Sequence, residues 1–208
     1  MNYLSVENIS KSYGERVLFD NVSFGINKDQ KIAFIAKNGS GKTTIMNMIN
    51  GLDEPDTGQV VIRKEINMAF LSQNNNLQDE LTIEENIFAS DNEILKVIER
   101  YEKALENPND EEAYQRAFDD TDRHNAWDFE TQFKQILYKL KLEDLKMKVK
   151  NMSGGQKKRL SLAIILISKP DLLILDEPTN HLDLEMIEWL EDYFAKENIT
   201  LFMVTHDR

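Results

Sequence analysis

A short apolar run, a glycine-rich loop and a helical stretch follow one another early in the chain, and together they restrict its fold more than any other feature. Residues 32–35 are apolar and strand-forming, residues 38–43 read N-G-S-G-K-T, and the helical pattern extends to about Ile49. Residues 36–44 match the phosphate-loop pattern G-x-x-x-x-G-K-[ST] except that Ala36 replaces the first glycine. The sequence therefore predicts an α/β fold built around a phosphate site.

Each residue type in this loop suits a triphosphate. Glycines let successive backbone N–H groups converge on phosphate oxygens, and the following helix presents its positive end. Lys42 is expected to reach the β- and γ-phosphates, Thr43 is expected to hold Mg²⁺, and Ala36 is acceptable if its φ angle stays negative. The nucleotide-binding residues expected here are Asn38, Gly39, Ser40, Gly41, Lys42, Thr43 and Thr44.

Two adjacent acids, Asp176 and Glu177, follow the apolar run 172–175. Ligands of open α/β sheets bind at the carboxyl ends of the strands. We therefore expect Asp176 to hold Mg²⁺, directly or through water, and Glu177 to orient the attacking water or accept its proton. Paired acids after a strand are also common in the first turn of a helix, so this assignment depends on the phosphate loop.

The coarse pattern of the chain is strands and helices in alternation, interrupted by a helical middle. The expected fold class is an α/β P-loop NTPase with a mainly parallel sheet flanked by helices, a small antiparallel β part and an inserted helical subdomain. That subdomain is expected at about residues 74–165 of a single domain spanning 1–208, with residues 32–35 as a fully buried strand. Strands are expected at residues 4–9, 17–24, 32–35, 60–62, 68–71, 172–175 and 200–204.

Charge and composition limit the function classes. The formal net charge is −12, and residues 91–130 carry thirteen acidic and five basic side chains. This balance argues against a nucleic-acid groove, and it predicts a solvated helical face or, alternatively, a partner-selecting surface. The chain has no cysteine, its first residues carry no secretory signal, and its longest apolar run is the six residues 162–167. We therefore expect a cytoplasmic protein without a membrane segment.

Three further segments gain meaning only alongside the loop and the acids. Residues 153–156, S-G-G-Q, open a helix whose backbone N–H groups can face an anion, although simple helix capping explains them as well. Gln73 follows a strand, and Tyr13 lies in an expected turn where it can stack on a purine. A lone Gln or Tyr is usually structural.

Taken together, these segments resemble the ATP-binding cassette (ABC) family over the whole chain. The resemblance implies a phosphate loop at 36–44, a Walker B strand at 172–176 and a D-loop at Asp183. It also implies the following roles: adenine stacking by Tyr13, sensing of Mg²⁺ and water by Gln73, a signature at Ser153, Gly154, Gly155 and Gln156, catalysis by Glu177, and a γ-phosphate contact by His206.

Asn180 and His181, just before Leu182 and Asp183, narrow the resemblance to the ABC-F branch. Members of that branch are soluble, carry two cassettes in tandem and mostly act on ribosomes. Residues 124–128, H-N-A-W-D, and the acidic helical block before them resemble the Uup type. Relatives continue past the switch histidine into a second cassette, so this chain resembles a first cassette.

The resemblance implies Mg-ATP hydrolysis at a composite site. Ser153 and Gly155 of a facing cassette are expected to contact the γ-phosphate, so an isolated cassette is expected to be a weak ATPase. The expected partner is a second cassette, in tandem or as a head-to-tail homodimer, with ribosome, RNA or DNA contacts made through regions absent here. The alternatives are the ATP-binding subunit of a membrane transporter, a non-hydrolysing ATP-gated clamp, and a Uup-type ATPase linked to branched DNA.

Overall fold

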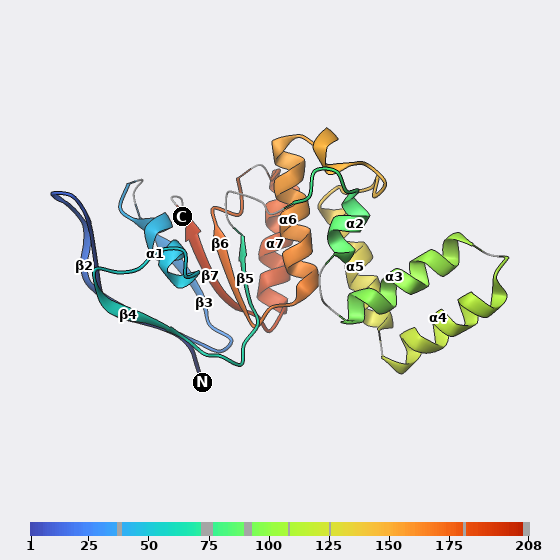
Figure 1. Ribbon diagram of the computed structural model, residues 1–208, viewed down its shortest axis with the longest axis horizontal. Helices are drawn as coiled ribbons and strands as arrows, with labels where there is room; N and C mark the ends of the chain where they lie inside the picture. The colour runs from blue at the N-terminus through green and yellow to red at the C-terminus, as the bar shows by residue number, and fades with distance from the viewer. Residues whose placement is uncertain are drawn as a thin grey trace. The chain divides into compact units, whose positions relative to one another are not determined.

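The chain forms two compact units, which Figure 1 traces from the N-terminus to the C-terminus. The computed structural model describes residues 1–36, 39–71, 77–89, 93–107, 109–124, 126–180 and 182–205. The first unit comprises Met1–Asn74 and Lys169–Arg208, and the second comprises Asn75–Ser168. The first unit is therefore assembled from two stretches that are far apart in sequence.

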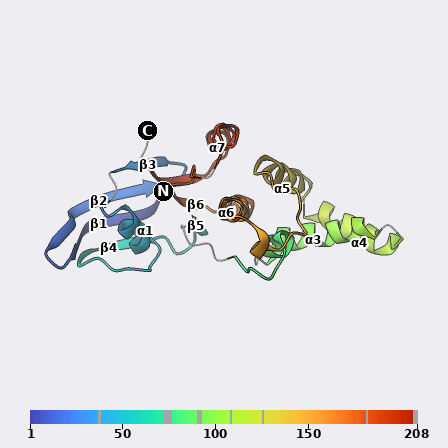
Figure 2. The same cartoon turned by 90° about the horizontal axis from the view of Figure 1, so that it is seen from above.

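A parallel sheet forms one layer of the first unit. Its strand order is β3 (Lys31–Ile35), β7 (Thr200–Thr205), β6 (Leu172–Asp176) and β5 (Met68–Leu71). All three neighbouring pairs in this order run parallel. Figure 2 shows helices α1 (Lys42–Ile49) and α7 (Leu184–Lys196) on opposite sides of this sheet. The mainly parallel sheet flanked by helices is confirmed.

An antiparallel sheet forms the other layer, in the order β2 (Arg16–Asn27), β1 (Asn2–Tyr13) and β4 (Thr57–Ile62). The first two strands have 12 residues each and are longer than predicted. Irregularities in their register, one of them between Val6 and Ile9, let the ribbon bend. The predicted small antiparallel part is therefore confirmed, with wider boundaries.

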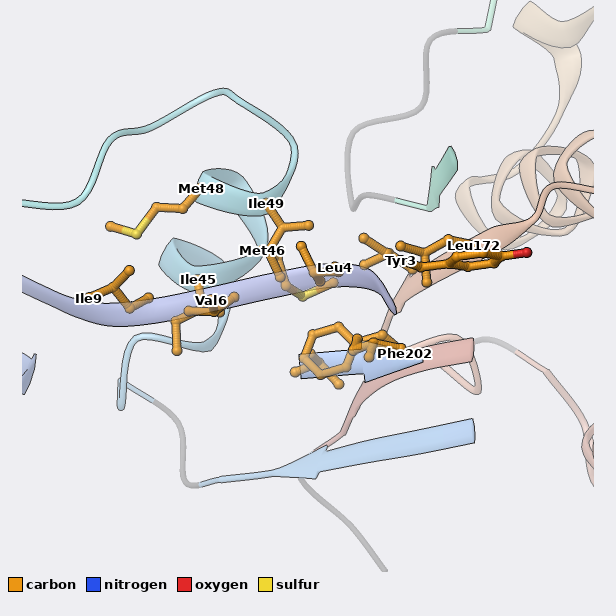
Figure 3. Close-up of a cluster of buried hydrophobic side chains, with 13 residues drawn as sticks. Tyr3, Leu4, Val6, Ile9, Ile45, Met46, Met48, Ile49, Leu172 and Phe202 are labelled. Atoms are coloured by element: carbon orange, nitrogen blue, oxygen red, sulfur yellow. The ribbon is translucent and has the colours of Figure 1, made fainter. Parts of the chain in front are cut away.

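The hydrophobic core of the first unit joins the two sheets through α1. Phe202 of β7 is 1% exposed and stacks on Phe24 of β2 with ring centroids 5.6 Å apart. Figure 3 shows side chains of β1, α1, β6 and β7 meeting around it. The fully or nearly buried members are Tyr3, Leu4, Val6, Ile9, Ile26, Ile45, Met46, Met48, Ile49, Leu172, Ile174, Phe202 and Val204. This core fixes β3, β6 and β7 beneath the loop that follows β3.

The expectation that residues 32–35 form a fully buried strand is wrong. Ile32 and Phe34 pack against the core, but Ile35 is 50% exposed. β3 is the end strand of the parallel sheet as described, and only one of its faces is covered by the core. β6 has neighbours on both sides, and all five of its residues are buried.

The second unit is helical. Its helices are α2 (Ile83–Phe88), α3 (Glu93–Glu106), α4 (Glu111–Arg123), α5 (Trp127–Lys139) and α6 (Gly154–Ser168), with a short 3₁₀ turn at Val149–Asn151. A capping box of Thr82 and Glu85 starts α2. α3 and α4 pack as a pair, and Trp127 contacts Tyr101 with ring centroids 5.1 Å apart. Within the described residues, every helix is too short or too polar to cross a bilayer.

Candidate functional site

The glycine-rich loop and the paired acids lie at the same edge of the parallel sheet. Ile35, the last residue of β3, pairs with Thr205 of β7, and Asp176, the last residue of β6, pairs with Val204 of the same strand. Only β7 separates the two strand ends, and neighbouring strands are about 4.8 Å apart. The chain therefore enters the loop roughly 10 Å from Asp176, at the carboxyl edge where α/β sheets bind ligands.

The glycines of the loop have backbone conformations that L side chains rarely adopt. The φ angles of Gly39 and Gly41 are 77° and 91°, and a Cβ atom on Gly41 would lie 2.9 Å from Cδ1 of Phe19. Arg16 of β2 donates from Nη2 to the carbonyl oxygen of Gly39 at 3.0 Å. Ala36 is not among the described non-glycine residues with positive φ, so alanine fits where the pattern has glycine.

Lys42 and Ser40 fit a phosphate-binding role. Lys42 begins α1, is 7% exposed, and donates from Nζ to the carbonyl oxygen of Ala36 at 2.7 Å. Ser40 Oγ is buried and has no hydrogen-bond partner among the described residues. A buried ammonium and an unpartnered hydroxyl at a helix N-terminus suit an anion. Thr43, in the first turn of α1, is exposed and Thr44 is half-buried.

The paired acids differ in their surroundings. Asp176 is 6% exposed at the end of β6. Glu177 has a φ angle of 48°, and its N–H donates to the carbonyl oxygen of Val204 at 2.9 Å. Its carboxylate accepts a hydrogen bond from Nδ2 of Asn180 at 2.7 Å. In the sequence Asn180 served only as a mark of the ABC-F branch, and this contact was not predicted; its signal in the sequence is the spacing of three residues between Glu177 and Asn180.

The donor set at this edge suits magnesium better than a metal held by protein alone. In the described parts of the chain, no group of three or more His, Cys, Asp or Glu side chains is placed to bind a metal ion. Mg²⁺ is commonly held by one or two protein oxygens together with substrate phosphates and water. The residues expected to supply those oxygens are Asp176, Thr43 and Gln73, of which Gln73 lies outside the described residues.

Tyr13 is the last residue of β1 and does not lie in the turn that was expected there. It pairs with Arg16 across the β1–β2 hairpin, and Arg16 contacts the glycine-rich loop. The Tyr13 side chain is 56% exposed, and its hydroxyl donates to Oδ2 of Asp53 at 3.0 Å. An exposed aromatic ring is therefore held at the end of the strand whose partner reaches Gly39.

Residues 153–156 lie in the second unit and have a clear local role. Ser153 N–H donates to Oε1 of Gln156 at 2.8 Å, and Gln156 N–H donates to Oγ of Ser153 at 3.3 Å. This reciprocal pair is a capping box that starts α6. Gly154 and Gly155 form its first turn, and a Cβ on Gly154 would meet no atom within 4 Å. Asp183 likewise caps α7, accepting from Met186 N–H at 3.0 Å.

Three of the predicted site residues, Asn38, Gln73 and His206, lie outside the described residues, as does His181. The structure brings the loop, Lys42, Asp176 and Glu177 to one sheet edge and ties the Tyr13 hairpin to the loop through Arg16. The signature residues belong to the other compact unit.

A glycine-rich loop between a parallel strand and a helix, with paired acids at the same sheet edge, defines a P-loop nucleotide-binding fold. Comparison with protein-family models gives the narrower assignment. The model described as "ABC transporter" matches residues 19–180. The chain belongs to the ATP-binding cassette family.

Similar proteins support the ABC-F resemblance. The chain is 40% identical to the uncharacterized ABC transporter ATP-binding protein YfmR of Bacillus subtilis, over 100% of this chain and 34% of that protein. It is 38% identical to ABC transporter F family member 2 of Arabidopsis thaliana, over 98% of this chain and 32% of that one. It is 32% identical to energy-dependent translational throttle protein EttA of Mycobacterium tuberculosis, over 98% of this chain and 38% of that protein.

These relatives, with ATP-binding protein Uup of Escherichia coli at 28% identity, confirm the resemblance to ABC-F proteins. The chain spans about a third of the length of the relatives it matches. A solved structure described as the ADP conformation of an ATP-binding cassette of an ABC transporter has the same fold. Its TM-score is 0.64 at 24% identity, over 100% of this chain and 82% of that one.

Proposed function

We propose that this chain is an ABC-F-type cassette that binds Mg-ATP at the carboxyl edge of the parallel sheet and hydrolyses it. The observation that carries the proposal is the meeting of two sequence-distant features at that edge: the loop after β3 and Asp176–Glu177 after β6, on either side of β7. A triphosphate on the loop amides and Lys42 has its γ end toward the two acids. Thr43 and Asp176 are the proposed metal ligands, with Gln73 as a further one.

Magnesium, when bound, neutralises charge on the phosphates and orients them. The chain's own residues then position the reacting groups. Lys42 offers an ammonium near the β- and γ-phosphates, and Ser40 offers a buried hydroxyl. Glu177 is the proposed base that orients the attacking water, with His206 as a γ-phosphate contact. Asn180 holds one oxygen of the Glu177 carboxylate at 2.7 Å.

We infer that the site is completed by a second cassette. Ser153, Gly154, Gly155 and Gln156 are proposed to face a nucleotide held by that partner, since backbone N–H groups in the first turn of a helix have no carbonyl partner within the helix and the helix N-terminus favours an anion. The length of the relatives supports a tandem partner in a longer protein. The similarity to energy-dependent translational throttle protein EttA supports a role in translation, which takes place in the cytoplasm. Ribosome or nucleic-acid contacts through other regions belong to the same proposal.

The test is Glu177→Gln, with Glu191→Gln on α7 as a matched control. The amide cannot accept a proton, so turnover should fall on the order of 100-fold or more while Mg-ATP binding is retained. Turnover is measured by phosphate release and binding by calorimetry. The control variant should match the unaltered chain in both. Equal turnover in Glu177→Gln and the unaltered chain would refute the assigned role.

A further inference from the structure

Lys11 and Asp53 both contact the exposed side chain of Tyr13. Asp53, in the turn after α1, uses one carboxylate oxygen for each of two partners: Oδ1 accepts from Lys11 Nζ at 2.8 Å, and Oδ2 accepts from the Tyr13 hydroxyl at 3.0 Å. The Lys11 ammonium also lies over the Tyr13 ring, 5.6 Å from its centroid. We refer to Lys11, Tyr13 and Asp53 as the tyrosine clamp.

The tyrosine clamp combines a largely buried ion pair with an exposed aromatic ring. The side chains of Lys11 and Asp53 are 11% and 25% exposed, whereas Tyr13 is 56% exposed. The hydrogen bond to Asp53 raises the pKa of Lys11, and the hydrogen bond from Lys11 lowers the pKa of Asp53. Both groups are therefore charged at neutral pH, and the carboxylate remains an acceptor for the tyrosine hydroxyl.

The turn that carries Asp53 is itself fixed to β1. Glu54 N–H donates to Oδ1 of Asp53 at 2.8 Å, and Lys11 Nζ donates to the Glu54 carbonyl oxygen at 2.6 Å. Asp56 N–H donates to the Ser10 carbonyl oxygen at 2.9 Å, and Asp56 Oδ2 accepts from Ser12 N–H at 2.8 Å. These hydrogen bonds hold Asp53, the acceptor of the tyrosine hydroxyl, in place against β1.

We propose that Lys11 and Asp53 are positioning residues that hold Tyr13 ready to stack on the purine base of the bound nucleotide, a role that rests on the proposed function. The ammonium occupies one face of the ring, which leaves the opposite face for a planar base. The β1–β2 hairpin that carries Tyr13 also contacts the phosphate loop, because Tyr13 pairs with Arg16 and Arg16 Nη2 donates to the carbonyl oxygen of Gly39. A ring ordered in advance loses less conformational entropy when a base stacks on it.

The test compares Mg-ATP with inorganic tripolyphosphate in the presence of Mg²⁺, because only ATP has a base. Calorimetry is carried out on the unaltered chain, Asp53→Asn, Tyr13→Phe, and the exposed Glu65→Gln as a control for lost charge. Tyr13→Phe keeps the stacking surface and removes the tethered hydroxyl. Since base–aromatic stacking is worth about 1–3 kcal/mol, we expect each clamp variant to weaken ATP binding about 5- to 10-fold. Tripolyphosphate binding should change less than about twofold in every variant.

A double variant separates positioning from a general loss of structure. Asp53 hydrogen-bonds to Tyr13 through the tyrosine hydroxyl, so this effect of Asp53→Asn is lost when the hydroxyl is absent. The double variant Tyr13→Phe with Asp53→Asn should therefore bind ATP about as tightly as the single variant that binds ATP less tightly. Additive losses, or equal losses for ATP and tripolyphosphate, would overturn the positioning role. So would ATP binding that Asp53→Asn leaves unchanged. Failure of the unaltered chain to bind either ligand would instead overturn the proposed function itself, and this inference with it.

Discussion

Glu177 has a backbone conformation that is costly for a residue with a side chain. Its φ of 48° lies in the left-handed region, and this conformation costs a non-glycine residue about 1–2 kcal/mol. Two hydrogen bonds maintain that conformation: the Glu177 N–H donates to the Val204 carbonyl oxygen, and the Asn180 side-chain amide donates to the Glu177 carboxylate. Backbone strain of this kind gathers at functional sites, and here it directs a carboxylate at the end of a buried strand.

Asn180→Ala should therefore impair turnover more than binding. Without the amide, the Glu177 carboxylate samples other rotamers, and we expect kcat to fall about tenfold while the Kd for Mg-ATP changes less than about twofold. Steady-state phosphate release and calorimetry measure the two quantities. Asn198→Ala, an exposed asparagine before β7, is the matched control. A parallel loss of binding and turnover in Asn180→Ala would show that the amide supports the fold and not the position of Glu177.

At the scale of elements, the β1–β4 pairing depends on a glycine at a bulge. The register shifts between Glu7 and Ser10, and Gly58 opposite them has a φ of 82°. A Cβ at Gly58 would lie 2.3 Å from the carbonyl oxygen of Glu7 and 2.4 Å from that of Asn8. Both obstacles are backbone atoms, so a side chain here forces the strands apart.

Gly58→Ala should lower the free energy of unfolding by about 3 kcal/mol, from the positive φ and the clash together. Gly51→Ala isolates the first of these terms, because Gly51 has a φ of 71° but nothing lies within 4 Å of its Cβ position. We expect the control to lose about 1 kcal/mol. Denaturant unfolding measures both. Equal losses would mean that the strands accommodate the methyl group.

Helix α7 contains a tyrosine whose ionisation opposes folding at high pH. Burial, together with the charge of Glu197, raises the pKa of Tyr193 to about 12. An unfolded tyrosine ionises near about 10, so between these values the unfolded chain has lost a proton that the folded chain retains. Stability therefore falls as pH rises through that window.

Tyr193→Phe should abolish this part of the pH dependence. Unfolding free energies at pH 9, 10 and 11 should show the variant gaining on the unaltered chain as the pH increases. Tyr138→Phe, at a tyrosine that is 69% exposed, is the control. Parallel pH profiles for the unaltered chain and Tyr193→Phe would contradict the assignment.

The sequence predicted the elements well because each carries its own periodic signal. The bounds of β5 match the strand predicted at residues 68–71, and the capping box that starts α2 is a local pattern of Thr82 and Glu85. Contacts between distant residues have no such signal. Asp53 meets Tyr13 across 40 residues. Likewise, the exposed face of β3 depends on which strands flank it. The capping role of Ser153 and Gln156 was visible in their spacing, but its weight could not be judged against an anion-binding role.

At the scale of the whole molecule, net charge affects how strongly two copies of the chain associate. The chain has a formal net charge of −12, and residues 91–130, which include α3, α4 and the start of α5, carry thirteen acidic and five basic side chains. Two such copies repel each other, and salt screens the repulsion because the Debye length falls to about 10 Å at 0.1 M. Association into the proposed composite site is therefore opposed by electrostatics at low ionic strength.

Raising NaCl from about 50 to about 300 mM should strengthen ATP-dependent association of Glu177→Gln several-fold. Sedimentation or gel filtration with Mg-ATP at both salt concentrations measures this, and the same samples without nucleotide are the control. Specific ATPase activity of the unaltered chain should rise with protein concentration in parallel. Association that weakens with salt would indicate that opposite charges attract across the interface.

The strand that leads into the phosphate loop pairs with a partner made very late. Lys31 of β3 pairs with Leu201 of β7, so 170 residues separate them along the chain. At synthesis rates of about 5–20 residues per second, the nascent β3 waits roughly 10 to 30 s for that neighbour. During this interval β3 lacks its hydrogen-bonding neighbour, and Phe34 lacks its ring contact with Phe202. The emerging polypeptide is therefore expected to be more prone to aggregation before β7 is made.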